Sequence, residues 1–262
     1  MINWNLVWAV VVRHLYNFRH SVDRASDAFY WPAMDVFLWG FASKAITQSS
    51  VNLPGIVVTI LSGLILWMIV WRGQYEITVN LLEEMWSQNL VNLFASPLRL
   101  REWVVGVFIL GFIKMLLTVG FAVFLAWIVY QANIFNLGFY LIPFMISLLL
   151  TGWAAGLIVS AVIVYYGTRI QTLAWSGVAI ITPFSGVFYP VSTLPDWAQK
   201  VSAFLPTSYI FEGMRIVIFK GTLPIDMLVK SFAINFLLLI FGLVFLRIMF
   251  EKSKNKSLAR LE

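Results

Sequence analysis

Three long stretches without any charged residue dominate this sequence, and they cover residues 45–71, 115–168 and 170–195. A bilayer core is about 30 Å thick, and a helix of about 20 apolar residues crosses it. The first and third stretches can each hold one such helix. The middle stretch can hold two, because the polar segment 131–136 interrupts it. These stretches indicate a protein that crosses a membrane several times.

The composition agrees with this interpretation. Hydrophobic residues make up 61% of the chain and charged residues only 11%, whereas a soluble domain has about 25% charged residues. Counting the apolar segments predicts an all-α membrane protein, organised as one transmembrane domain over residues 1–262. We expect six transmembrane helices, at about 28–48, 53–71, 103–130, 138–166, 172–190 and 228–249.

The N-terminal segment, residues 1–27, has the pattern of an interfacial helix. Its apolar residues recur at spacings of three and four, while arginines and histidines interrupt the run. An amphipathic helix of this kind suits the membrane surface, with its cations at headgroup level. The alternative is the first part of a slanted span. The apolar set is Trp4, Trp8, Val11, Leu15 and Phe18.

A polar segment, residues 72–102, separates the second span from the third. Its middle part, 77–94, is amphipathic, and Ser96-Pro97 ends the predicted helix. The apolar face can lie on the bilayer or on neighbouring spans. It can also enter a groove on a soluble partner, to which Glu83 and Glu84 would present their charges. Periodicity alone leaves both possibilities open.

The distribution of Lys and Arg predicts the orientation, because cytoplasmic loops carry an excess of both. With six spans, both termini lie on one side, together with segment 72–102 and the basic tail 251–262. The opposite side receives fewer cations, namely Lys44, Lys200, Arg215, Lys220 and Lys230. We therefore expect a multi-pass protein of the plasma membrane with both termini in the cytoplasm.

The outer segment, residues 183–220, is rich in prolines and aromatic residues. Each proline removes a backbone donor and breaks or kinks a helix. Broken backbone at membrane depth is tolerated only where protein or water surrounds it. We therefore predict a re-entrant helical hairpin between spans five and six. Glu212 and Arg215 stand at i and i+3, so they can pair on one helix face. The punctuating residues are Pro183, Gly186, Tyr189, Pro190, Pro195 and Pro206.

Several function classes are disfavoured. The chain has no cysteine, and its two histidines, His14 and His20, lack a partner carboxylate in the sequence pattern. It also lacks the GxxxxGK[ST] phosphate-binding loop. We therefore predict no catalytic residues, no metal site and no ATP hydrolysis by this chain. The net charge of +6 is explained by the cations that flank the spans, so nucleic acid is not an expected partner.

The outer segment resembles the permease of type-2 ABC exporters, the ABC-2 membrane family. The resemblance is carried by the run Phe-Ser-Gly-Val-Phe-Tyr-Pro at 184–190, and by Leu194-Pro195, Leu205-Pro206, Glu212-Gly213 and Arg215. Ser96-Pro97, followed by Glu102 and Gly106, also fits the family pattern. The number and spacing of the spans agree over the whole chain. The sequence Tyr-Tyr-Gly-Thr-Arg at 165–169 departs from the motif of the polysaccharide branch, which weakens a polysaccharide assignment.

The resemblance implies a membrane-spanning subunit of an ATP-driven exporter that moves an amphipathic or lipid-linked substrate outward by alternating access. Two copies of such a chain, or two related chains, associate with two ATP-binding cassette subunits that bind ATP and Mg²⁺, and of the two arrangements we favour the homodimer. This chain itself would bind no cofactor. The helix at about 78–95 would be the coupling helix, with Glu83, Glu84 and Gln88 contacting the ATPase.

A substrate path between two permeases would run along spans one, two and five, with Trp39, Gln48, Trp67 and Phe184 as lining residues. Asp35, Lys44 and Lys114 are charged residues inside the first and third predicted spans. We expect Lys44 and Lys114 to extend toward an interface and Asp35 to make a hydrogen bond between helices. The competing interpretation is a secondary transporter or channel without an ATPase partner, which would favour inverted repeats. The two halves of the sequence show no convincing similarity.

Overall fold

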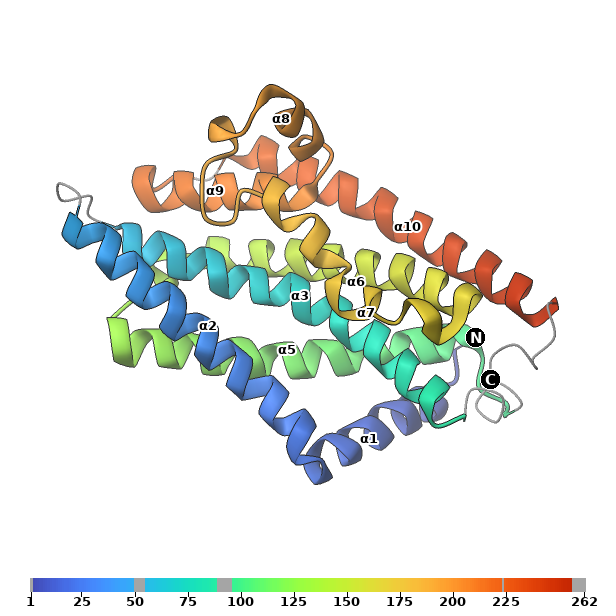
Figure 1. The fold of residues 1–262 in the computed structure, drawn as a ribbon. Helices are drawn as coiled ribbons and strands as arrows, with labels where there is room; N and C mark the ends of the chain where they lie inside the picture. Colours follow the sequence, from blue (N-terminus) through green and yellow to red (C-terminus); the bar gives the residue numbers. More distant parts are fainter. Residues whose placement is uncertain (1, 50–54, 89–95, 223, 256–262) are drawn as a thin grey trace.

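The computed structural model describes residues 2–49, 55–88, 96–222 and 224–255, and within these ranges the chain is built from helices and turns without a strand. Figure 1 shows the long helices lying side by side as an elongated bundle. The prediction of an all-α fold is confirmed.

Four helices are long and apolar enough to cross a membrane: α3 (Ile56–Trp86), α5 (Leu100–Tyr130), α6 (Leu141–Tyr166) and α10 (Ile225–Asn255). The candidate span around α6 also includes the short helical turns on either side of it, so that it covers residues 134–170. α2 (Val22–Ser49) occupies the predicted first span. It is long enough, but it is less apolar and carries Pro32 inside. The described residues thus provide four candidate spans, and the total of six stays a prediction.

The predicted fifth span is not one continuous helix. Residues 167–184 form four short pieces: η2 (Gly167–Ile170), α7 (Leu173–Ser176), η3 (Val178–Ile180) and η4 (Thr182–Phe184). Pro183 lies in the first turn of η4, and the Gln74 side chain of α3 bonds to backbone groups in the broken region. The prediction of an uninterrupted helix over 172–190 is therefore wrong.

The boundary predicted after the second span is also wrong. α3 continues without a break from Ile56 to Trp86, through the charged residues Arg72 and Glu76. These charges do not force the helix out of the bundle because both side chains are buried and paired. Residues 78–86 therefore extend a long helix instead of starting a separate surface helix. Residues 89–95 of the predicted coupling helix lie outside the described residues.

The centre of the bundle is the crossing of α3 and α6. A Cβ atom added to Gly152 would lie 2.5 Å from the carbonyl oxygen of Val70, and one added to Gly156 would lie 2.8 Å from Ile77. Gly152 and Gly156 thus form a small-residue step on α6 on which α3 rests. Close contact between helix backbones is the usual basis of helix association in lipid.

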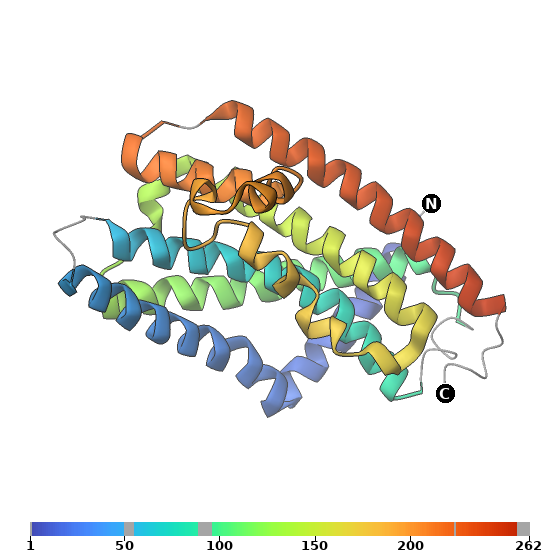
Figure 2. The same ribbon diagram turned by 45° about the horizontal axis from the view of Figure 1, so that its top comes forward.

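α10 packs along α6 at the side of the bundle (Figure 2), and polar side chains fasten the two helices. Asn235 donates to the carbonyl oxygen of Ser147 at 2.9 Å and accepts from Thr151 at 2.8 Å. Ser231 also lies 2.7 Å from the Ser147 hydroxyl. Much of the opposite face of α10 is exposed and apolar, which suits contact with lipid or with another membrane helix.

The N-terminal helix, a short turn before α6 and the outer segment complete the fold. α1 (Trp4–His20) packs on α5, and η1 (Ile134–Tyr140) leads into α6. α2 begins at Val22, so the interfacial segment ends earlier than the predicted residue 27.

The outer segment folds as η5 (Val191–Thr193), α8 (Asp196–Ser202) and α9 (Pro206–Lys220). α9 packs against α10 and α6, whereas α8 stands away from the long helices in Figure 1. That this segment re-enters the membrane stays a prediction.

Candidate functional site

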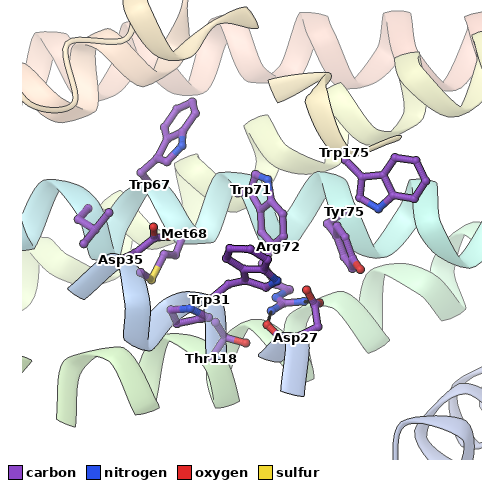
Figure 3. A pocket seen from close by; sticks show the side chains of 12 residues that line it. Asp27, Trp31, Asp35, Trp67, Met68, Trp71, Arg72, Tyr75, Thr118 and Trp175 are labelled. Carbon is purple, nitrogen blue, oxygen red and sulfur yellow. Dashed lines mark hydrogen bonds and ion pairs between the residues drawn. The ribbon is translucent and has the colours of Figure 1, made fainter. Parts of the chain in front are cut away.

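A cavity of about 450 Å³ lies between α2 and α3 (Figure 3). This volume is typical of small-molecule sites, which measure about 300–1,000 Å³. Five of its twelve lining residues are aromatic, and one of these is a tryptophan of α7. The lining residues are Asp27, Trp31, Pro32, Asp35, Leu64, Trp67, Met68, Trp71, Arg72, Tyr75, Thr118 and Trp175.

Arg72 and Asp27 form an ion pair at one end of this cavity. The Arg72 guanidinium donates to the Asp27 carboxylate at 3.1 Å and to the Asp27 carbonyl oxygen at 3.3 Å. It also lies 5.4 Å from the ring centres of both Trp71 and Tyr75. These contacts connect α2 to α3 and surround the cation with carboxylate and aromatic groups.

The ion pair continues into the bundle away from the cavity. Arg72 donates to Glu76 at 3.3 Å, and Lys114 of α5 donates to the other carboxylate oxygen of Glu76 at 2.7 Å. Asn80 donates to the same oxygen at 3.3 Å. Lys114 is only 6% exposed, so the expectation that it extends to the interface is wrong. Its amine stays in the bundle because Glu76 neutralises it there.

Asp35 and Lys44 differ from Lys114. Asp35 is half-buried and lines the cavity, but no described residue gives it a hydrogen bond or an ion pair. The expected hydrogen bond between helices is therefore absent from the part of the chain that the structure describes. Lys44 is exposed and lies 5.3 Å from the ring centre of Tyr130.

The structure places the three described residues of the predicted substrate path in different surroundings. Trp67 lines the cavity. Trp39 stacks on Phe188 at 4.0 Å between ring centres, and Phe184 packs edge-on against Trp197 at 5.8 Å. The side chain of Gln48 lies outside the described residues. Trp67 is thus the one of the described three that contributes to the cavity.

The end of α3 meets α1. Arg13 donates to Glu84 at 3.0 Å, and the ring nitrogens of His14 lie 3.9 Å from Glu83 and 3.8 Å from Glu84. Glu84 is 2% exposed, so its charge is not presented on a free surface as expected. Gln88 is exposed and Glu83 is partly exposed. The coupling role of these three residues stays a prediction.

In the outer segment, the predicted pair of Glu212 and Arg215 is present, at 3.6 Å. Arg215 also donates to the carbonyl oxygens of Gly186 and Tyr189. Glu212 accepts from the backbone N–H of Val191 at 2.6 Å. Two side chains of α9 therefore hold the loop at 186–191 in place.

The remaining residues of the outer segment shape its turns. The Tyr189 hydroxyl donates to the carbonyl oxygen of Pro183 at 2.7 Å. Gly186 has a φ of 65°, a conformation that favours glycine. Pro190 precedes η5, Pro195 precedes α8, and Pro206 occupies the first turn of α9, where a missing N–H costs nothing.

Sequence reasoning missed Gln74 of α3. Its amide donates to the carbonyl oxygen of Ala174 at 2.6 Å and accepts from the N–H of Val178 at 3.1 Å. Thr78 also donates to Ala174 at 3.0 Å. These bonds satisfy backbone groups where the fifth predicted span is broken, as a membrane interior requires. Gln74 stands between Arg72 and Glu76 in the segment predicted to be polar, so no separate sequence signal marked this role.

Four helices long and apolar enough to cross a membrane, packed in one bundle, define a multi-pass membrane protein. Comparison with known proteins then gives the family. The family described as "ABC-2 type transporter" matches residues 5–219. The chain is also 30% identical over 193 residues to "ABC transporter G family member 20" of Dictyostelium discoideum.

The chain belongs to the ABC-2 type transporter family, and it is a transmembrane permease. The alignment with the Dictyostelium protein covers 70% of this chain but 25% of that relative, so the chain corresponds to about a quarter of its length. The family implies association with an ATP-binding cassette subunit.

Proposed function

We propose that this chain is the permease subunit of an ATP-driven exporter that moves an amphipathic or lipid-linked substrate outward. The family match over residues 5–219 carries the proposal. The cavity between α2 and α3 supports it, because an aromatic wall beside a few charged groups suits a molecule with an apolar body and a polar end. ATP and Mg²⁺ bind on a separate ATPase chain.

The complex consists of two copies of this permease, as a homodimer, and two ATP-binding subunits in the plasma membrane. Both termini face the cytoplasm, as the distribution of cations predicts. The substrate leaves between the two permeases by alternating access. ATP binding closes the soluble subunits, and their motion rotates the membrane helices as rigid bodies.

The end of α3 is the surface proposed to meet the ATPase. The exposed residues there are Trp86, Ser87 and Gln88, and Glu83 is partly exposed. Glu84 is buried and accepts a hydrogen bond from Arg13. Because α3 is continuous from Ile56 to Trp86, a force on this end reaches the wall of the cavity through one rigid helix. The coupling surface therefore moves Arg72 and Trp71 directly.

The test is copurification in mild detergent from native membranes. We expect an ATPase with a phosphate-binding loop to accompany the permease at equal stoichiometry. The double variant Glu83→Lys/Gln88→Lys should lose most of the ATPase, because it reverses and adds charge at the proposed contact. Lys230→Glu, a charge change at an exposed residue of α10, is the matched control and should retain the ATPase.

Absence of an ATPase from the unmodified complex would refute the exporter assignment and favour a secondary transporter. Retention of the ATPase by the double variant would refute the coupling surface. Glu84→Lys is unsuitable for this test, because it would place two cations together at the junction of α1 and α3.

A further inference from the structure

The cavity between α2 and α3 has one carboxylate near each end. Asp27 lies beside Arg72, and Asp35 lies beside Met68 further along α2 (Figure 3). Eight residues separate the two aspartates, which corresponds to about 12 Å along a helix. Trp31 stands between them on the same helix. The two carboxylates therefore face different parts of one cavity.

The charges around the cavity do not balance. Arg72 contacts Asp27 and Glu76, and Glu76 also binds Lys114. Two cations and two carboxylates make this network neutral. Asp35 stands outside it, since no described residue pairs with its half-buried carboxylate. The cavity thus carries one unmatched negative charge in a largely apolar surrounding.

The walls have a chemistry that favours cations. Aromatic ring faces attract positive charge, and tryptophan does so most strongly. Trp71 and Tyr75 already flank the Arg72 guanidinium, each at 5.4 Å. Trp31, Trp67 and Trp175 supply three further indole rings to the lining. An unpaired carboxylate among indole rings is an arrangement that holds a large organic cation.

We propose that this cavity binds a hydrophobic organic cation, with its charged centre at Asp35 and its apolar body against the tryptophans. This inference names the substrate class, and in that respect it rests on the proposed function. An anion would meet two aspartates and an arginine that is already neutralised, so anions should bind poorly. A charged ligand that enters an apolar cavity loses its hydration, and without an opposite charge in the cavity this loss is strongly unfavourable.

The experiment uses the full chain in lipid nanodiscs, with any partner that copurifies, and needs no transport. Two probes of matched shape and opposite charge, tetraphenylphosphonium and tetraphenylborate, are measured separately by equilibrium dialysis, with empty nanodiscs subtracted. Saturable binding is expected for the cation only. Asp35→Asn should weaken it by roughly tenfold or more, the scale of one desolvated charge pair.

Three variants sharpen the result. Asp35→Glu should retain the cation, Trp67→Leu should weaken it, and Asp226→Asn, which removes an exposed carboxylate of α10, should leave it unchanged. An Asp35→Asn protein that melts like the unmodified one but binds the cation equally well would overturn the proposal. Equal saturable binding of the borate would also overturn it. Because copurification of the ATPase is read independently, either failure leaves the exporter assignment standing.

Discussion

The amine of Lys114 lies 2.7 Å from one carboxylate oxygen of Glu76 and joins α5 to α3 inside the bundle. Both side chains are nearly fully buried. A buried charge is strongly destabilising when it has no opposite charge beside it. Glu76 has a second cation, Arg72, at 3.3 Å, whereas Lys114 has no second carboxylate among the described residues. This difference in partners makes the pair asymmetric.

We expect Glu76→Gln to destabilise the protein more than Lys114→Met does. Glu76→Gln leaves Lys114 buried without a counter-ion, a change that costs about 3–5 kcal/mol. Lys114→Met leaves Glu76 still paired with Arg72, so its loss should be smaller. Thermal unfolding of the purified protein measures both. The double variant should be more stable than Glu76→Gln alone, and a double variant no better than that single one would contradict the pairing.

The small-residue step on α6 gives a second prediction. Gly152→Ala places a methyl group 2.5 Å from the Val70 carbonyl oxygen, so α3 and α6 must separate, at a cost of about 1–3 kcal/mol. Gly120→Ala in α5 is the matched control, because nothing lies within 4 Å of its added Cβ. Melting temperatures should fall for the first variant and hold or rise for the second. Equal melting temperatures would contradict the close crossing.

The broken segment between α6 and α9 depends on Gln74. Gln74→Leu keeps the size of the side chain but leaves the Val178 N–H without its acceptor, while Ala174 keeps the bond from Thr78. An unsatisfied buried donor costs about 1–3 kcal/mol. Hydrogen exchange should therefore increase at residues 174–180 and stay unchanged in α10. An unchanged exchange rate at Val178 would show that Gln74 does not hold this segment.

Because the chain contains no cysteine, the orientation can be mapped without removing native thiols. Thr193→Cys, in the exposed turn before α8, should react with a membrane-impermeant maleimide in intact cells. Ser87→Cys, at the end of α3, should react only after permeabilisation. The opposite pattern would invert the predicted topology.

The same label tests Arg215. In the Thr193→Cys background, Arg215→Lys should accelerate labelling. The Nη2 nitrogen on the planar guanidinium of Arg215 donates to two carbonyl oxygens, whereas a lysine offers a point charge on a flexible stem. Lys220→Arg, at the C-terminal end of α9, is the control and should not change the rate. Equal rates for all three proteins would mean that Arg215 does not hold the loop.

Helix positions followed from the sequence for three of the predicted spans, but not for 172–190. Segments 103–130 and 228–249 lie within α5 and α10, and segment 138–166 covers the end of η1 and all of α6. The prediction failed where buried polar groups find partners in distant helices. Arg72 and Glu76 look like the start of a surface segment until Asp27 and Lys114 are seen beside them.

The candidate site was less accessible to sequence reasoning. The pair of Glu212 and Arg215 was predicted because the two residues are three positions apart and therefore lie on one helix face. The cavity required α2 to lie against α3, which brings together residues about 40 positions apart. Of the predicted path residues, Trp67 was found in its wall. Asp35 was noted as an intramembrane charge, but its lack of a partner became visible only in three dimensions.

We infer a consequence for membrane insertion from the order of the charged helices along the chain. α3 precedes α5 in the chain, and its Arg72 and Glu76 can neutralise each other within one turn of a single helix. α3 can thus enter lipid before any later helix exists. α5 carries Lys114 with no carboxylate one turn away, and its counter-ion in the folded protein, Glu76, is on α3. The helix that enters first thus carries the carboxylate, Glu76, that pairs with the lysine of the later helix.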